Sequence, residues 1–445
     1  MGLLARAGGL TTSGRARVAA SWAMYDFANT IFSFVVVSFA IGLWLVSDER
    51  FGERDGNFAL SVAVVVSVGL NALVSPILGA LSDRGGRRLP YLLFFTLLCI
   101  VPTLFIGGSA PILGVTLFII ANFGYQAALI YYDATLKTVS KPATRGRLSG
   151  IGVGVGYVGT IFAALVLLAF DVAVNDRFLV AGVLFALFAI PIFVFVRETG
   201  PIGKVTWSDV RGSLTQLRAS VAHAREVPGL LRFLVGRFFY SDAVNTIIVV
   251  MSVVTTKAKG LTESQALIVL LLLTVAAIVA SFGWGYLVDR LGPRRTLMIV
   301  LSSWAVGLVL GAISLSIDGP LGLALFFIAG AILGSGLGGV QVADRVLMVR
   351  LSPPERVGEF FGLYGLVGKG SQVVGQLLYG FTLLLFFDVL GVGAYQLAVL
   401  TLLGTMLIGA WILRPVSDRW AGSGDLDVHA PPERMAPMSA PIEPR

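Results

Sequence analysis

The sequence is poor in the residues that build disulfides, metal centres and acid–base relays. It has one cysteine among 445 residues, Cys99, so an internal disulfide and a thiolate metal cluster are both excluded. The two histidines, His223 and His429, fall in polar segments, which excludes a histidine metal site or proton relay inside a membrane. There is no Walker A sequence, which excludes ATP-driven transport by this chain, and no nucleophile–base pair stands out. We therefore expect no metal, no cofactor and no enzymatic activity.

Charged residues are also scarce. They make up 13% of the chain, hydrophobic residues make up 56% and the mean hydropathy is +0.87, whereas about a quarter of the residues of a soluble domain are charged. The sequence therefore predicts an all-α membrane protein with a transmembrane helix for each apolar run of spanning length. These 12 runs lie at 19–46, 57–81, 89–108, 111–137, 147–170, 178–196, 231–256, 264–288, 296–317, 320–350, 357–387 and 393–414.

The basic residues are sorted by loop. Most of the 33 Lys and Arg residues lie in the N-terminus, in the loops after even-numbered helices and in the C-terminal segment. The opposite side holds Arg50, Arg54, Arg177, Lys257 and Lys259. This asymmetry predicts both termini in the cytoplasm, with the chain in the inner (cytoplasmic) membrane of a bacterium and in contact with its lipids. It accounts for the net charge of +8 without nucleic acid as a partner, and we expect a monomer.

Two segments do not have the composition of a membrane span. Between 197 and 231, apolar residues at helical spacing predict an amphipathic helix on the inner leaflet, with a partner-binding helix as the alternative. Residues 417–445 have no periodicity, and we expect a disordered cytoplasmic tail. The predicted domains are a six-helix bundle at 1–197, a cytoplasmic loop at 198–230, a second six-helix bundle at 231–416 and the tail at 417–445.

The two halves of the chain repeat each other. The pattern D-x-x-N-T-I occurs at 26–31 and at 242–247. The pattern D-x2-L-x5-P-x2-R occurs at 133–145 and 344–356, and G-x3-D-R-x-G occurs at 79–86 and 285–292. Each copy has the same place in its half. These collinear matches indicate two homologous six-helix bundles in parallel repeat, the layout of a major facilitator transporter.

The third pattern resembles a signature loop of that superfamily, the loop between its second and third helices. The copies read "GALSDRGGRR" (79–88) and "GYLVDRLGPRR" (285–295). The resemblance implies a gating role, and a basic anchor for membrane topology is the alternative. The gating candidates in these loops are Gly79, Asp83, Arg84, Arg87, Asp289 and Arg290. Further gating candidates near the helix ends and in the eleventh predicted helix are Arg145, Arg356, Glu359 and Lys369.

The aspartates inside the predicted helices follow the repeat. Asp26, Asp133, Asp242 and Asp344 fall in the first, fourth, seventh and tenth predicted helices, which line the central cavity in the major facilitator fold. A carboxylate in hydrocarbon costs about 3 kcal/mol or more, so these groups should face water, substrate or one another. A structural alternative is a salt bridge of Asp26 or Asp242 with Arg237 or Arg345.

Two G-x-G-x-x-G runs, at 154–159 and 334–339, lie inside predicted membrane helices and follow no strand. They favour close helix packing over a dinucleotide site.

A narrower resemblance is carried by "SWAMYDFANTIF" (21–32), "YYDATLKTVS" (131–140) and "FLVGRFFYSDAVNTI" (233–247). These stretches are similar to the vacuole-effluxer-like branch of the superfamily, which includes autophagy-related vacuolar amino-acid exporters. The branch usually has Asn after the tyrosine of helix 4 and Ser-Arg-Ser in helix 10. This chain has Asp133 and Asp344-Arg345-Val346 there, so its substrate preference is expected to differ.

The function predicted from these features is secondary active transport of a small polar or zwitterionic solute, amino-acid-like and exported, by alternating access. A proton-linked exporter of cations or drugs, and a transporter-like receptor, are the alternatives. Because no histidine lies in the membrane, any proton coupling must use a carboxylate; uniport remains open. The substrate-binding candidates are Tyr25, Asp26, Asn29, Tyr125, Gln126, Asp133, Tyr240, Asp242, Asn245, Gln341, Asp344 and Arg345.

Overall fold

The computed structural model describes residues 12–84, 87–139, 145–198, 207–353 and 356–417. Within these ranges every regular element is a helix. The first half contains α1 (Thr12–Phe32), the π-helix η1 (Ser33–Ala40), α2 (Ile41–Leu45), α3 (Gly52–Arg84), α4 (Leu89–Ile106), α5 (Pro111–Val139), α6 (Arg145–Ala169) and α7 (Val174–Phe195). After α8 (Trp207–Glu226), the second half contains α9 (Leu230–Val253), the π-helix η3 (Val254–Ala258), α10 (Glu263–Leu291), α11 (Pro293–Leu315), α12 (Gly319–Leu351), α13 (Val357–Leu390) and α14 (Gly393–Leu413).

The structure confirms the predicted membrane helices. The described residues contain 12 helices or joined helices long and apolar enough to cross a membrane, with α1, η1 and α2 forming one span and α9 and η3 another. The second span is longer than predicted at both ends: the prediction was 57–81, whereas α3 begins at Gly52 and ends at Arg84. Its first turn holds Glu53 and Asp55, whose charges favour a helix N-terminus although they are too polar for an apolar window.

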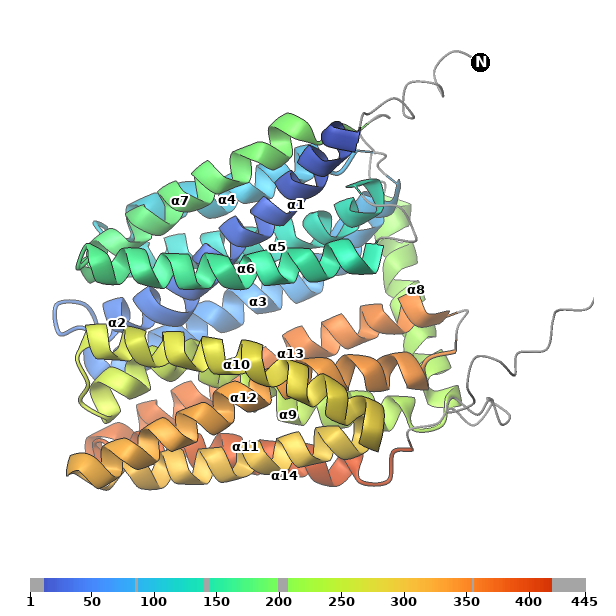
Figure 1. Cartoon of the computed structure of the whole chain (residues 1–445). Coiled ribbons are helices and arrows are strands. Elements are labelled where there is room, and N and C mark those ends of the chain that lie inside the picture. Colours follow the sequence, from blue (N-terminus) through green and yellow to red (C-terminus); the bar gives the residue numbers. More distant parts are fainter. Residues whose placement is uncertain (1–11, 85–86, 140–144, 199–206, 354–355, 418–445) are drawn as a thin grey trace, which may run out of the picture.

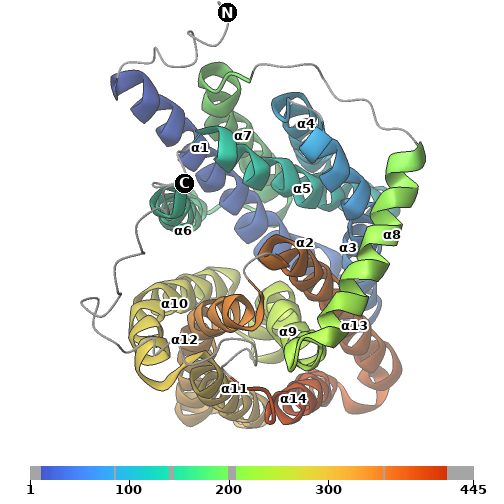
Figure 2. The same ribbon diagram turned by 90° about the vertical axis from the view of Figure 1, so that its right-hand side faces the viewer.

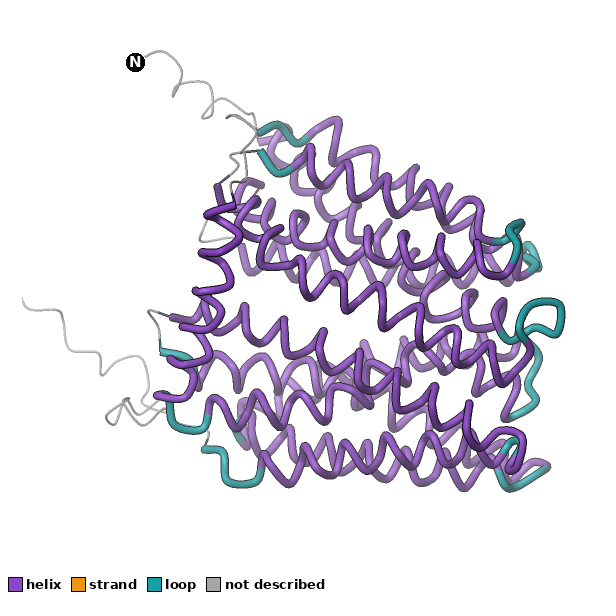
Figure 3. The backbone as a smooth tube through the Cα atoms, turned by 180° about the vertical axis from the view of Figure 1, so that it is seen from behind, coloured by secondary structure: helices purple, strands orange, loops and turns teal. Residues whose placement is uncertain are grey.

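The helices form two groups that lie side by side, α1–α7 and α9–α14 (Figure 1). Seen end-on, α8 crosses one end of both groups (Figure 2), where it contacts α3 of one group and α9 and α13 of the other. We call this the α8 end and the opposite end the distal end. Loops gather at both ends and helices fill the space between them, as the view from behind shows (Figure 3).

The first helix of each half changes its winding after the D-x-x-N-T-I motif. In the first half η1 follows α1, and the hydroxyl of Ser38 donates to the carbonyl of Ser33, five residues earlier, at 3.1 Å. In the second half η3 follows α9 in the same way. Wide π turns are rare and often occur at functional sites. A π-helix is present in the first span of each half, which extends the repeat seen in the sequence to the helix geometry.

The glycine-rich runs are helix contacts, as predicted. A Cβ added at Gly159 of α6 would lie 2.5 Å from the Phe27 carbonyl oxygen of α1, and one at Gly152 would lie 2.6 Å from the Trp22 ring. A Cβ added at Gly334 of α12 would lie 2.8 Å from the Leu273 carbonyl oxygen of α10. The missing side chains let these helix pairs approach each other closely.

Polar contacts between the two groups are concentrated at the distal end. Arg54 of α3 pairs with Asp388 of α13 at 3.2 Å, and Arg177 of α7 pairs with Glu263 of α10 at 2.7 Å. The Asn57 amide donates to the Tyr395 hydroxyl at 3.0 Å and accepts from the hydroxyl of Tyr379 at 3.0 Å. Both hydrogen bonds are buried. The two halves are therefore held together at this end.

Candidate functional site

Charged side chains of both halves face each other between the two groups of helices. Asp133 of α5 and Arg345 of α12 are both exposed, although each lies in a helix of membrane-spanning length. The Asp133 carboxylate lies within electrostatic range of Arg345 and of Lys369 in α13. Asp26 of α1 is partly buried and in turn lies within range of Asp133. We call Asp26, Asp133, Arg345 and Lys369 the central charged cluster.

Arg345 has two further neighbours in this region. Gln341 lies one turn before it in α12, and its side chain is also exposed, so the two share a helix face. The ring of Tyr157 in α6 lies within electrostatic range of the guanidinium. Tyr157 was not predicted from the sequence. The only indication there is that this polar aromatic residue lies beside the glycines that allow close helix packing.

Several candidates of the first half lie next to Asp26. The Tyr125 hydroxyl is close to Ser33, Asn29 and Asp26, and its ring packs against Phe32 with centroids 5.0 Å apart. The side-chain oxygen of Asn29 is buried without a hydrogen-bond partner among the described residues. Gln126 follows Tyr125 in α5 and is partly buried.

Tyr25 lies apart from this group, in the core of the first half. Its side chain is fully buried, its hydroxyl is 2.7 Å from that of Thr96, and its ring stacks on Tyr132 with centroids 5.0 Å apart. These contacts give Tyr25 a packing role: its hydroxyl lies within electrostatic range of Asp26, but its side chain is buried inside the first half.

The carboxylate of Asp344 already has a cationic partner. The Arg237 Nε of α9 donates to Asp344 Oδ2 at 3.0 Å, and Arg237 Nη1 donates to the Tyr364 carbonyl at 2.9 Å. The guanidinium also lies 3.5 Å from the centroid of the Tyr364 ring, and Tyr240 packs beside Asp344. The predicted alternative of Arg237 pairing with Asp26 or Asp242 is therefore wrong, because Arg237 binds Asp344 instead.

Asp242, the counterpart of Asp26 in the second half, is shielded from the central charged cluster. It is 1% exposed, and its Oδ1 accepts a hydrogen bond from the Thr405 hydroxyl of α14 at 2.7 Å. Asn245, one turn later in α9, is only partly buried. The two copies of D-x-x-N-T-I thus place their aspartates in different surroundings.

The gating candidates are dispersed over the α8 end. Arg87, Asp289, Arg290 and Arg356 are exposed there, with Arg290 lying 4.5 Å from the centroid of the Tyr286 ring. Glu359 binds His223 of α8 at 2.8 Å. The side chains of Asp83, Arg84 and Arg145 lie outside the described part of the structure, and Gly79 is a helical position of α3.

Among the gating candidates, Lys369 joins the two halves directly. Its ammonium group donates to Asn71 Oδ1 at 2.5 Å and to the Ser75 hydroxyl at 2.9 Å, both in α3. The sequence predicted neither partner, although Asn71 is recognisable as a polar residue within an apolar run.

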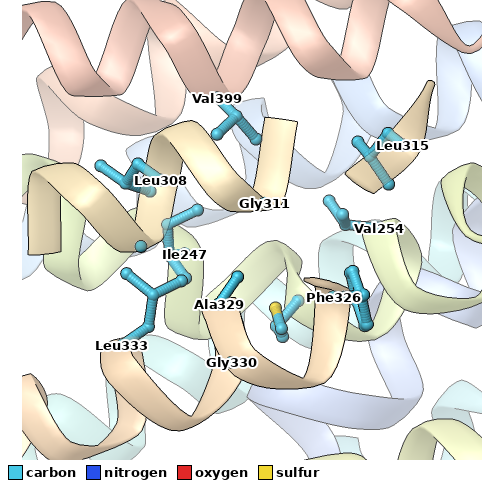
Figure 4. Close-up of a pocket in the computed structure, with 12 residues that line it drawn as sticks. Ile247, Val254, Leu308, Gly311, Leu315, Phe326, Ala329, Gly330, Leu333 and Val399 are labelled. Carbon is cyan, nitrogen blue, oxygen red and sulfur yellow. The ribbon is translucent and has the colours of Figure 1, made fainter. Parts of the chain in front are cut away.

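A small pocket lies within the second half, between α9, α11 and α12 (Figure 4). Ile247, Leu308, Phe326 and Leu333 line it, and its other lining residues are aliphatic side chains, methionine and glycine. Such a lining offers no group that recognises a charge. The central charged cluster is thus the better candidate for a polar ligand.

Twelve membrane spans among the described residues, in two repeated groups with opposite charges between them, define a transporter of the major facilitator (MFS) type. Solved structures with the same fold include a nucleoside transporter (TM-score 0.72, 13% identity, 89% of this chain and 99% of that chain) and a D-xylose–proton symporter (0.65, 14%, 91% and 97%). A bacterial homologue of the lysosomal transporter Spinster in an inward-facing, unoccupied conformation is also similar (0.67, 14%, 93% and 100%).

Within this class, the model of the vacuole effluxer Atg22-like family matches residues 135–413. The chain belongs to this family, which confirms the resemblance read from the sequence. An uncharacterized MFS-type transporter of Bacillus subtilis, YxiO, is 27% identical over 413 residues, which cover 88% of this chain and 93% of that protein. Autophagy-related protein 22 of Coccidioides immitis is 24% identical over 260 residues, which cover 53% and 43%.

Proposed function

We propose that this membrane transporter exports a small zwitterionic solute of the amino-acid type by alternating access. One observation carries the proposal: the Asp133 carboxylate of the first half lies within electrostatic range of Arg345 and Lys369 of the second half, and Asp26 lies within range of Asp133. A solute with an ammonium group and a carboxylate complements both sides at once. Arg345 binds the carboxylate of the solute, since a guanidinium matches its planar geometry, and the aspartates bind its ammonium group.

The remaining candidates complete the proposed site. Gln341 and Tyr157 supply hydrogen-bonding groups beside Arg345, and Asn29, Tyr125 and Gln126 supply them beside Asp26. Asp344 and Tyr240 lie around Arg237. In our proposal they do not contact the solute but hold α12 in position. Asn245 stays a proposed contact. Tyr25 is left out of the proposed site.

The proposed movement is a rocking of residues 1–197 against residues 231–416, with α8 resting on both at one end. The basic loops place the α8 end in the cytoplasm, within an inner membrane and with a monomeric chain. In this orientation the distal contacts close the outer side, and the gating residues act at the cytoplasmic side. Transport is coupled to protons in this proposal, and uniport is the alternative that the experiments below separate from it.

The test is transport by purified protein in proteoliposomes, with radiolabelled amino acids offered one at a time. Wild-type protein should exchange at least one of them across the membrane. Arg345→Gln should lose this exchange. Arg350→Gln is the matched control and should retain it, because Arg350 is another exposed arginine of α12 but lies nearer the end of the helix. Equal loss in both variants, or equal retention, would remove Arg345 from the site.

The carboxylates of Asp26 and Asp133 also favour a second candidate, export of an organic cation. A cation needs Asp26 and Asp133 but not Arg345. Transport of a labelled cation that survives Arg345→Gln would select this function over the zwitterion.

A further inference from the structure

Asp242 is a second buried carboxylate, whose surroundings differ from those of its repeat partner Asp26. The Asp242 side chain is 1% exposed and points away from solvent, between α9, α13 and α14. Its Oδ1 accepts a hydrogen bond from the Thr405 hydroxyl at 2.7 Å, whereas its Oδ2 has no hydrogen-bond partner among the described residues. A buried carboxylate anion with one unpaired oxygen is costly, because the charge loses its hydration on burial.

A second unpartnered group lies beside it. Thr246 follows Asp242 by one helical turn, on the same face of α9, and its hydroxyl is fully buried without a partner among the described residues. Gly375 of α13 packs on this face, since an added Cβ there would meet the Thr246 hydroxyl and lie 3.0 Å from Asp242 Cβ. Among the described residues Asp242 belongs to no group of three or more side chains that could hold a metal ion, whereas a proton needs only the one carboxylate.

The charged and titratable groups of the neighbouring elements are engaged elsewhere. Arg237 of α9 binds Asp344, and Lys369 of α13 binds Asn71 and Ser75. Tyr379 of α13 and Tyr395 of α14 bind Asn57 at the distal end, and Tyr395 is the one titratable residue of α14. The helices η1 and α2, which pack against α9, have no titratable residue. The groups that act on the Asp242 carboxylate are Thr405 and the Ala243 backbone N–H.

We propose that Asp242 carries the coupling proton of this transporter, at a site separate from the one that binds the solute. In the closed form Oδ2 holds the proton as a carboxylic acid, one helical turn from the buried Thr246 hydroxyl. When the Asp242 site opens to water, the O–H bond breaks and the proton passes to water, leaving the carboxylate. A proton from the other side of the membrane restores the acid before the site closes. This inference rests on the proposed proton-coupled transport.

In this proposal the opening of the Asp242 site is linked to rocking through α13. The helix that covers Asp242, α13, is the same helix that contacts the other half, through Lys369 at the α8 end and through Gly380 against Ser61 of α3. Rocking of the halves breaks the contacts between α3 and α13. A shift of α13 that follows separates Gly375 from Asp242 and admits water to the carboxylate.

The first experiment does not require a known solute. Infrared difference spectra of purified protein between acidic and alkaline buffers should contain the carbonyl band of a protonated carboxylic acid that disappears in Asp242→Asn. The same band should persist in Asp26→Asn, the matched variant of the other repeat copy. An identical band in wild-type protein and Asp242→Asn overturns the proposal. Asp242→Asn should remain folded, since Asn has the shape and the neutrality of the protonated acid. Thr405→Val is a second variant, which should alter the band without removing it.

The second experiment uses proteoliposomes with a labelled amino acid that wild-type protein exchanges. A gradient of one pH unit supports up to about tenfold accumulation for each coupled proton. Asp242→Asn should retain exchange at zero gradient and lose accumulation, while Asp26→Asn should lose both. Accumulation by Asp242→Asn equal to wild type, or accumulation driven by a Na⁺ gradient instead, overturns the proton site. If exchange by wild-type protein does not respond to the pH gradient, the protein is a uniporter and carries no coupling proton. If wild-type protein exchanges no amino acid, the proposed function is wrong, and the infrared result is unaffected.

Discussion

At the scale of single residues, neighbours in the sequence have separate roles. Asp26 points from α1 toward the central charged cluster, whereas Tyr25 is turned about 100° around the helix into the core of the first half, where it contacts Thr96 and Tyr132. The pattern "YD" identified both as polar groups in an apolar run. Only the packing of α1 against α4, α5 and α7 shows which of them faces the interior of its own half.

This difference predicts opposite results for two adjacent substitutions. Asp26→Asn should abolish transport and leave membrane insertion and the thermal midpoint unchanged, because it removes a charge from the proposed solute site. Tyr25→Phe should retain transport and lose about 1 kcal/mol of stability, the usual value of one hydrogen bond. Proteoliposome exchange and thermal unfolding in detergent measure the two effects. Full transport by Asp26→Asn would remove it from the site.

A second residue-scale prediction concerns the pair of Arg237 and Asp344. Asp344 is 2% exposed, so Arg237→Met leaves an unpaired buried carboxylate and should cost about 3–5 kcal/mol. Replacing both residues, as Arg237→Met with Asp344→Leu, should recover most of that loss. Thermal unfolding of the four proteins in a double-mutant cycle gives the coupling. Additive effects of the two single changes on stability would show that the interaction between Arg237 and Asp344 does not stabilise the fold.

At the scale of helices, hydrophobic runs and repeats predicted the spans, because the bilayer constrains length and composition strongly. The repeat also identified which helices carry the aspartates. The partners of those aspartates were not predictable in this way. Arg237 with Asp344, Thr405 with Asp242 and Lys369 with Asn71 each join helices far apart in the sequence, and a single sequence does not report how two helices are rotated toward each other.

The contact between α1 and α6 supports a prediction about glycine positions. A Cβ added at Gly156 would lie 2.8 Å from the Thr30 hydroxyl and 3.1 Å from Asp26 Oδ2, whereas one at Gly154 meets nothing within 4 Å. Gly156→Leu should therefore separate the helices and either trap one conformation or lower the thermal midpoint, with loss of transport. Gly154→Leu is the matched control and should behave as wild type. Unchanged transport and unfolding in Gly156→Leu would contradict a packing role.

At the scale of the whole molecule, the two ends of the bundle hold the halves together unequally. The distal end has the Arg54–Asp388 and Arg177–Glu263 pairs and the Asn57 hydrogen bonds, and the α8 end has Lys369 with its partners in α3. Alternating access requires that one set of contacts breaks while the other forms. The contacts present here belong to a form closed at the distal end, and their loss should favour the form open there.

Asn57→Ala tests this balance, since it removes the hydrogen bonds with Tyr379 and Tyr395 without touching the central charged cluster. The reporter is Ser61→Cys in a background of Cys99→Ala, because Ser61 is fully buried against Gly380 at the interface of the halves and becomes reachable only when the distal end opens. Two lost hydrogen bonds at about 1 kcal/mol each should shift the equilibrium at least about tenfold, seen as faster labelling by a membrane-impermeant thiol reagent. Lys369→Met weakens the contacts at the α8 end and should slow the labelling. A labelling rate unchanged by Asn57→Ala would mean that the distal contacts do not set the conformational balance.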